Sequence, residues 1–169
     1  MNKELIIVRH AKSDWGQSGL DDHDRTLNSR RLRDAPRMAE ALLERGISPT
    51  AILASTAVRA QTTARIFARQ FGFPEGDLVS DHCWYHASPL TWLKTIQALP
   101  ETQRTVLIFG HNPGLEELAA ELLGSGTAVG PLVTCGVVRL KPREEIPWSA
   151  ICPGSVELIE HLTPKSLES

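Results

Sequence analysis

Short apolar runs alternate along the chain with longer segments in which apolar residues recur every three or four positions. The runs at residues 5–8, 52–55 and 105–109 are continuous enough to predict buried strands. The longer segments predict amphipathic helices between them. Alternating strands and helices are typical of α/β architecture, and this is the fold class that the pattern predicts.

Four segments have the helical spacing, and each meets a residue that ends helices. They cover residues 32–43, 60–71, 90–96 and 115–122, with stops at Gly46, Gly72, Pro100 and Gly124. Pro36 lies inside the first segment and predicts either a kink or a later helix start. Ser55 or Thr56 is expected to cap the second helix, and Ser88 followed by Pro89 is a good start for the third.

The remaining segments predict shorter strands and one long loop. Residues 78–79, 133–140 and 148–151 are strand-like, whereas residues 13–25 are polar and predicted to form a loop over the candidate site. The acidic residues of this region, Asp21, Asp22 and Asp24, are expected to be solvated or, alternatively, to order Arg25. No repeat or linker interrupts the chain, so residues 1–169 are expected to form a single domain that buries about 70% of its unfolded surface.

Composition and charge argue against several classes of function. A net charge of −2 leaves no basic surface of the kind that binds nucleic acid. No apolar run reaches the roughly 20 residues that span a bilayer, so no membrane association is expected. The chain enters its first strand almost at once, which leaves no room for a signal peptide. The cysteines Cys83, Cys135 and Cys152 are dispersed without CxxC spacing, which fits a reducing, cytoplasmic location.

Arginine and histidine recur just after the predicted strands. Arg9 and His10 follow the first strand, Arg59 comes shortly after the second, and His111 follows the strand at 105–109. In open α/β sheets ligands bind outside the carboxyl ends of the strands, so these four side chains are expected to face one crevice. Guanidinium groups match phosphate oxygens in bidentate geometry, and histidine forms covalent intermediates. The pattern therefore predicts phosphoryl chemistry rather than hydride or acyl transfer.

Spacing alone leaves the roles within this cluster open. Either His10 or His111 is the nucleophile, kept neutral by the neighbouring arginines, while the other histidine stabilises the transition state. Asn112 stands at a predicted helix start whose backbone N–H groups suit an anion. The competing interpretation treats the arginines as surface ion-pair partners and the histidines as packed residues. Recurrence of the same residue types at equivalent strand ends favours the functional interpretation.

The residues around these positions resemble the histidine phosphatase superfamily, also called phosphoglycerate-mutase-like. The Ala-Lys-Ser-Asp-Trp that follows the Arg-His pair is similar to its short SixA-type phosphohistidine phosphatase branch. The matching stretches span nearly the whole chain and cover residues 7–15, 22–28, 34–38, 55–60, 87–89, 110–118 and 153–155. The resemblance implies a three-layer α/β/α sandwich around a mainly parallel sheet.

The resemblance also implies roles for individual residues. His10 is then the nucleophile that becomes phosphohistidine, and Arg9, Arg59 and His111 form the phosphate pocket. Arg25 matches a further arginine that reaches the phosphate or the substrate. No metal and no cofactor is implied. The implied activity is that of a metal-independent phosphatase, acting on protein phosphohistidine.

The chain departs from the family pattern at a few positions. Thr26 and Thr56 stand where prolines are usual, and Arg31 replaces a glycine, changes that affect loop geometry more than chemistry. His86 is different, because a glutamate is common at this position in the branch. In many members of the superfamily a glutamate in this region is the proton donor. His86 is therefore the candidate proton donor, at most a weak and pH-dependent one.

Two other functions fit the same residues. One is the same chemistry on small phosphomonoesters, and the other is a phosphate-binding module without catalysis. The presence of both His10 and His111 argues against the second. The expected partner is accordingly a phosphorylated protein or a small phosphorylated metabolite, and the sequence is compatible with a monomer.

A zinc site is a further interpretation of one short segment. His82 and His86 are four residues apart, with Cys83 next to the first. The next helix is expected to begin only after Ser88, so the two histidines do not share a helical face. No fourth ligand is evident, and a metal site is not expected.

Overall fold

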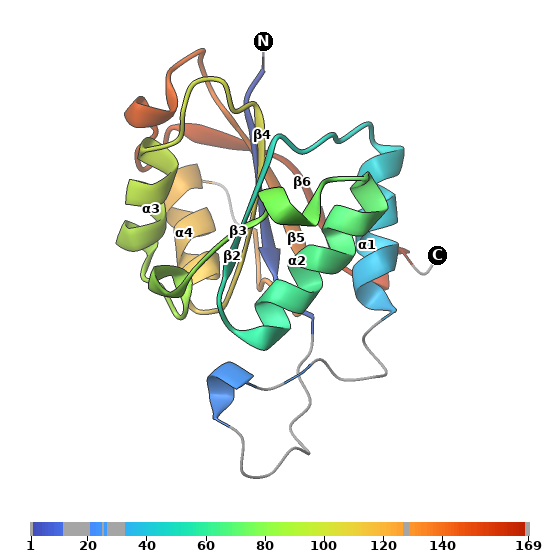
Figure 1. Ribbon diagram of the computed structural model, residues 1–169. Helices are drawn as coiled ribbons and strands as arrows, with labels where there is room; N and C mark the ends of the chain where they lie inside the picture. Colours follow the sequence, from blue (N-terminus) through green and yellow to red (C-terminus); the bar gives the residue numbers. More distant parts are fainter. Residues whose placement is uncertain (1, 12–20, 25, 27–32, 127–128, 168–169) are drawn as a thin grey trace.

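A six-stranded sheet forms the centre of the computed structural model, which describes residues 2–11, 21–24, 26, 33–126 and 129–167. The strand order is β3-β2-β4-β1-β5-β6 (Figure 1). The strands are β1 (Glu4–Arg9), β2 (Ala51–Ser55), β3 (Val79–Asp81), β4 (Thr105–Gly110), β5 (Val137–Pro142) and β6 (Val156–Leu162). Strands β3, β2, β4 and β1 are parallel, and β5 and β6 are antiparallel to their neighbours.

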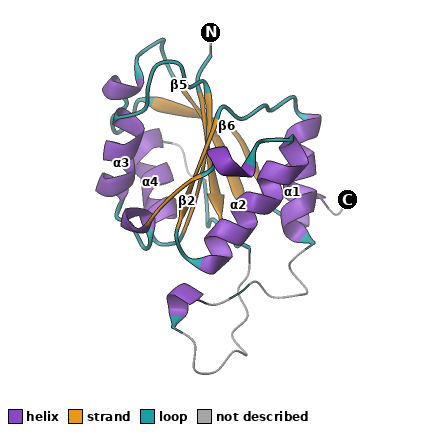
Figure 2. Ribbon diagram, in the orientation of Figure 1, coloured by secondary structure: helices purple, strands orange, loops and turns teal. Residues whose placement is uncertain are grey.

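Helices cover both faces of this sheet. Figure 2 shows α1 (Asp34–Glu44) and α2 (Val58–Phe71) on one side, with α3 (Pro89–Gln97) and α4 (Gly114–Leu123) on the other. Five short 3-10 helices complete the described elements: η1 (Asp22–Asp24), η2 (Glu75–Asp77), η3 (His82–Trp84), η4 (Trp148–Ala150) and η5 (Lys165–Leu167). The expected three-layer α/β/α fold is confirmed.

Alternate residues of the central strands supply two separate apolar cores. In β1, Ile7 packs into the core under α3 and α4, whereas Ile6 and Val8 pack into the core under α1 and α2. All three side chains are completely buried. Burial on both faces explains why β1 is a continuous apolar run in the sequence.

The register aligns the carboxyl ends of the central strands. Arg9 is opposite Gly110 of β4, and Ala54 of β2 is opposite Phe109. The residues that follow β1, β2 and β4 therefore emerge at one edge of the sheet. This alignment positions the candidate site.

Most predicted helix ends are found where expected. Gly72 adopts the left-handed conformation (φ 69°) that ends α2, and the Ser88 hydroxyl accepts a hydrogen bond from the Thr91 N–H at the start of α3. Pro36 is the third residue of α1, so the helix starts late and is not kinked. In the first turn a proline costs no intrahelical hydrogen bond, because those N–H groups lack helical partners.

Several local predictions were wrong. The cap residue of α2 is Ala57, which has no capping side chain; neither Ser55 nor Thr56 takes that position. The strand predicted at 133–140 begins only at residue 137, because Cys135 has a positive φ of 59° that no strand residue adopts. Residues 148–150 form η4 instead of a strand.

Strand β6 was missed. Its polar residues, among them Glu157 and Glu160, interrupt the apolar pattern, and it lies at the edge of the sheet where charged side chains are common. Across the described part of the chain, none of the helices has the length and apolar character needed to cross a membrane.

Candidate active site

Three strand ends bring together the Arg/His cluster. Arg9 ends β1 and His10 follows it, His111 follows β4, and Arg59 lies in the first turn of α2, just after β2. His10, Arg59 and His111 keep only 7%, 3% and 3% of their surface exposed. Burial of three such polar side chains side by side is costly unless they are hydrogen-bonded to one another. They are.

The His10 ring has one nitrogen fixed as a donor and the other as an acceptor. Its Nδ1 lies 2.6 Å from the backbone carbonyl of Ala11, which can only accept, so Nδ1 carries the proton. Its Nε2 accepts a hydrogen bond from Nε of Arg59 at 3.3 Å. The neutral ring therefore presents the Nε2 lone pair to the pocket. Burial, helped by the positive charges of Arg59 and Arg9, lowers the pKa of His10 to about 4.

The loop that carries His10 is anchored on both sides. The Ala11 N–H donates to the buried hydroxyl of Thr63 on α2 at 3.0 Å, and that hydroxyl donates to the Arg59 carbonyl at 2.7 Å. From the opposite side the Cys135 N–H donates to the carbonyls of Arg9 and His10 at 3.1 and 3.0 Å. The unusual φ of Cys135 turns this N–H toward the loop. These bonds fix the direction of the His10 ring.

His111 packs against His10 and is oriented by Ser55. The two ring centroids are 5.1 Å apart. Nη2 of Arg59 lies 3.3 Å from His111 Nδ1, and because a guanidinium can only donate, Nδ1 is the acceptor. The other nitrogen, Nε2, then donates to the Ser55 hydroxyl at 2.7 Å. Burial, with a smaller contribution from His10 and Arg59, lowers the pKa of His111 to about 2.

Arg9 and Asn112 meet at one carbonyl. Nη1 of Arg9 and Nδ2 of Asn112 donate to the Leu132 oxygen at 3.1 and 2.8 Å, while the Leu132 N–H is held by Glu116 at 2.8 Å. Burial lowers the pKa of Arg9, and the nearby guanidinium of Arg59 acts in the same direction. The Nε of Arg9 is buried and makes no hydrogen bond within the described residues.

The rim of the site is formed by Tyr85, His86 and η1. Figure 1 shows η1 beyond the edge of the sheet at which α2 begins. One carboxylate oxygen of Asp22 accepts from Arg59 Nη2 at 2.8 Å, from the Tyr85 hydroxyl at 2.5 Å and from His86 Nε2 at 3.0 Å. Partial burial raises the pKa of Asp22, but these three donors outweigh it and hold the pKa well below its usual range.

A close backbone contact holds the rim against α4. A Cβ at Gly114 would lie 2.0 Å from the Ala87 carbonyl oxygen, so only glycine fits at the start of α4. Beside this contact lies a pocket lined by residues 86–89, 112–114 and 117. It adjoins the histidine cluster, since the His86 and His111 rings are 4.8 Å apart.

A protein family and several solved structures resemble this chain. The histidine phosphatase superfamily (branch 1) matches residues 5–79. The structure of a candidate phosphohistidine phosphatase SixA from Agrobacterium tumefaciens has a TM-score of 0.81 and 29% identity, covering 97% of this chain and 99% of that one. The chain belongs to the histidine phosphatase superfamily.

Two further relatives match most of the length of this chain. The protein histidine phosphatase SixA in complex with tungstate has a TM-score of 0.82 at 20% identity, with 98% and 99% of the two chains covered. An uncharacterized chloroplastic protein of Arabidopsis thaliana is 31% identical over 150 residues, which are 83% of this chain and 67% of the relative. The SixA structure with tungstate shows that its fold is shared by this chain.

The structure places most of the expected site residues at one location. His10, Arg59 and His111 are in direct contact, Arg9 and Asn112 lie at their edge, and His86 is on the rim. Arg25 lies outside the described residues. His82 and His86 have separate hydrogen-bond partners, the Thr56 hydroxyl and the Asp22 carboxylate. No cluster suited to a metal ion occurs in the part of the chain that is described.

Sequence reasoning missed four residues that the structure places in the site. They are Asp22, Ser55, Thr63 and Tyr85. Asp22 was expected to be solvated, and its contact with Arg59 corrects that expectation. A signal was available for Ser55, which ends a strand whose neighbours carry the cluster. For Thr63 and Tyr85 the sequence offers no comparable signal.

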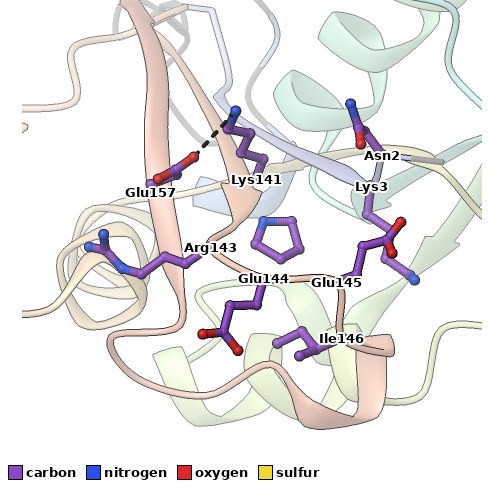
Figure 3. Close-up of a pocket in the computed structure, with 9 residues that line it drawn as sticks. Asn2, Lys3, Lys141, Arg143, Glu144, Glu145, Ile146 and Glu157 are labelled. Carbon is purple, nitrogen blue, oxygen red and sulfur yellow. Dashed lines mark ion pairs between the residues drawn. The ribbon is translucent and has the colours of Figure 1, made fainter.

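A second pocket lies at the opposite end of the sheet. Figure 3 shows it between the start of β1, the end of β5 and the start of β6. Its lining carries both signs of charge, and Lys141 pairs with Glu157 at 3.3 Å. Because these cations already have acidic neighbours, this pocket does not resemble an anion site.

Proposed function

We propose that the protein is a phosphatase that works through a covalent phosphoryl intermediate on His10. The observation that carries the proposal is the fixed His10 ring, whose Nδ1 proton is held by the Ala11 carbonyl while Nε2 faces Arg59. A pKa of about 4 keeps this nitrogen unprotonated at neutral pH, so its lone pair is free to attack phosphorus.

The surrounding groups suit the charge of a transferring phosphoryl group. That charge is spread over three equatorial oxygens, and catalysis is mainly positioning and electrostatic stabilisation. Arg9 and Arg59 supply permanently charged donors. His111 lies beside them, with its N–H held by the Ser55 hydroxyl in the ligand-free protein. Asn112 orients the same carbonyl as Arg9 and supports its position. Because these side chains meet the electrostatic demand, the proposed mechanism requires no metal ion.

Water completes the reaction in a second step. Attack of water on the phosphorus breaks the bond to His10 Nε2, returns the electron pair to the ring and releases inorganic phosphate. The arginines stabilise the same oxygens in both steps. The protein is thereby restored for another turnover.

Protein phosphohistidine is the substrate that the residues favour. An imidazole leaving group has a much lower pKa than an alkoxide, so it needs less help from an acid, whichever group of the rim supplies the proton. Similarity to the Agrobacterium tumefaciens protein, which is described as a candidate phosphohistidine phosphatase, points the same way.

A substrate panel with and without a chelator tests this function. Purified protein should dephosphorylate a phosphohistidine protein with higher kcat/KM than an alkyl phosphate, and EDTA should leave both rates unchanged. Preference for small phosphomonoesters would refute the substrate assignment. Phosphate binding without turnover of any substrate would identify a non-catalytic phosphate-binding module and refute the proposed phosphatase activity.

A further inference from the structure

Both terminal nitrogens of Arg59 are already engaged within the protein. Nη2 donates to the Asp22 carboxylate at 2.8 Å, and Nη1 donates to the Asp22 backbone carbonyl. The proposed function, on which this inference rests, requires these nitrogens to hold phosphoryl oxygens in a bidentate fork. A bound phosphoryl group must therefore displace Asp22 from Arg59.

Asp22 lies at the end of the Arg59 guanidinium that is remote from His10. Arg59 turns Nε toward His10 Nε2 and its terminal nitrogens toward Asp22. A phosphoryl group attacked by His10 loses its leaving atom on the side opposite His10, because attack and departure are roughly in line. The Asp22 carboxylate therefore borders the path of the leaving group.

The rim gives the leaving group space next to this carboxylate. His86 Nε2 lies 3.0 Å from Asp22, and His86 also lines the rim pocket. Tyr85 donates to the same carboxylate oxygen at 2.5 Å. Two side chains of the rim thus hold Asp22 at the mouth of the site when Arg59 is taken by substrate.

The exchange of partners changes how strongly Asp22 binds a proton. In the ligand-free protein the cation of Arg59 helps to keep Asp22 ionised. A dianionic phosphoryl group removes that cation as a partner and places negative charge beside the carboxylate. Both changes raise the pKa of Asp22, so substrate binding itself promotes protonation.

We propose that Asp22 is the catalytic acid of this phosphatase, displaced from Arg59 by the substrate and delivering its proton to the leaving atom. His86, the candidate donor from the sequence, is then a positioning residue that acts through Asp22. Arg59 serves the carboxylate in the free protein and the phosphoryl group in the complex.

The proposed step balances for a phosphomonoester. The His10 Nε2 lone pair forms the N–P bond as the bond from phosphorus to the ester oxygen breaks, and the Asp22 carboxyl proton passes to that oxygen. The products are the alcohol, phosphorylated His10 and the Asp22 carboxylate. In the second step the carboxylate accepts a proton from the attacking water, the P–N bond breaks and inorganic phosphate is formed.

The leaving-group dependence of Asp22→Asn tests this assignment. Asparagine keeps the size of the side chain but cannot donate a carboxyl proton. We expect kcat/KM for an alkyl phosphate to fall by about 10²–10⁴-fold, the usual contribution of a general acid. For p-nitrophenyl phosphate, whose leaving group needs no proton, kcat/KM should be nearly unchanged, because kcat/KM reports only the steps up to phosphorylation of His10. Asp21→Asn on the same loop is the matched control and should retain wild-type rates with both substrates.

Three outcomes would overturn the role of Asp22. One is an equal change in kcat/KM for both esters, as expected if Asp22 only competes for Arg59. Another is a steep leaving-group dependence in His86→Gln but not in Asp22→Asn. The third is loss of phosphoryl transfer to His10 from p-nitrophenyl phosphate in Asp22→Asn. Trapping phosphorylated His10 in the wild type separates these results from failure of the proposed function, in which no such adduct forms.

Discussion

The low proton affinity of His10 gives a quantitative prediction. Moving the pKa of this ring from 6.5 to about 4 corresponds to about 3 kcal/mol of free energy. At pH 7 the protonated fraction is then about 0.1%, against about a quarter for an unperturbed histidine. Nearly every molecule therefore carries a nucleophilic Nε2. An NMR titration, with the His10 resonances assigned by their absence in His10→Asn, should show a midpoint near pH 4.

The cause of the shift predicts the effect of removing a charge. Burial is the largest cause, and the cation of Arg59 contributes less. In Arg59→Met, which keeps the site filled, the His10 midpoint should rise but stay below 6.5. A wild-type midpoint at or above 6, or a full return to 6.5 in Arg59→Met, would refute burial as the main cause.

The same pKa has a consequence for stability. Between pH 6.5 and 4 the unfolded chain binds a proton at His10 more readily than the folded protein does, so the free energy of unfolding falls as the pH falls. The contribution from His10 should be about 3 kcal/mol over this range. Urea denaturation should show that the free energy of unfolding of the wild type is lower at pH 4 than at pH 7. In His10→Asn this pH-dependent decrease should be smaller by the His10 contribution. An equal pH dependence in the two proteins would contradict the shift.

Substitutions at Arg59, Thr63 and Gly114 probe the site, with Gly76 as a control position. Arg59→Ala should lower the rate of the chemical step by about 10²–10³-fold. Arg59→Lys should recover only part of this rate, because a lysine point charge cannot replace the bidentate guanidinium fork. Equal rates for the wild type and Arg59→Lys would exclude a bidentate role for Arg59. Thr63→Val should lower the free energy of unfolding in urea by about 1–3 kcal/mol and slow turnover, because it leaves the Ala11 N–H buried without its acceptor. Thr63→Ser, which keeps the hydroxyl, should retain wild-type stability and turnover. Gly114→Ala should lower Tm by forcing the Ala87 carbonyl away, while Gly76→Ala, which meets nothing within 4 Å, should not.

The fold could be predicted wherever burial leaves a periodic signal. Strands β1 and β4 are buried on both faces, and the helices pack one apolar face against the sheet, so their sequences report their structures directly. Strand β6 is different, because its edge position allows charged residues that break the pattern. The start of β5 could not be predicted, since it depends on the φ of Cys135, which is set by contacts with the His10 loop.

The candidate site was only partly accessible to sequence reasoning. Arg9 ends β1, and His10 and His111 directly follow β1 and β4. Because the carboxyl ends of parallel strands lie at one edge of the sheet, the sequence predicts that these side chains lie together. Asp22 has no such anchor: its position depends on hydrogen bonds from Arg59 and from rim residues that are distant in the sequence. From the sequence, the neighbouring arginines were expected to keep the nucleophilic histidine neutral. In the structure burial is the larger cause of the lowered pKa of His10.

Trapping the phosphorylated enzyme tests the central claim most directly. Wild-type protein mixed briefly with a phosphohistidine protein, quenched without acid and digested, should yield one acid-labile, alkali-stable phosphoryl group, located on His10 by mass spectrometry. His10→Ala should yield none and should not turn over substrate. A phosphoryl group on another residue, or full activity of His10→Ala, would contradict the account.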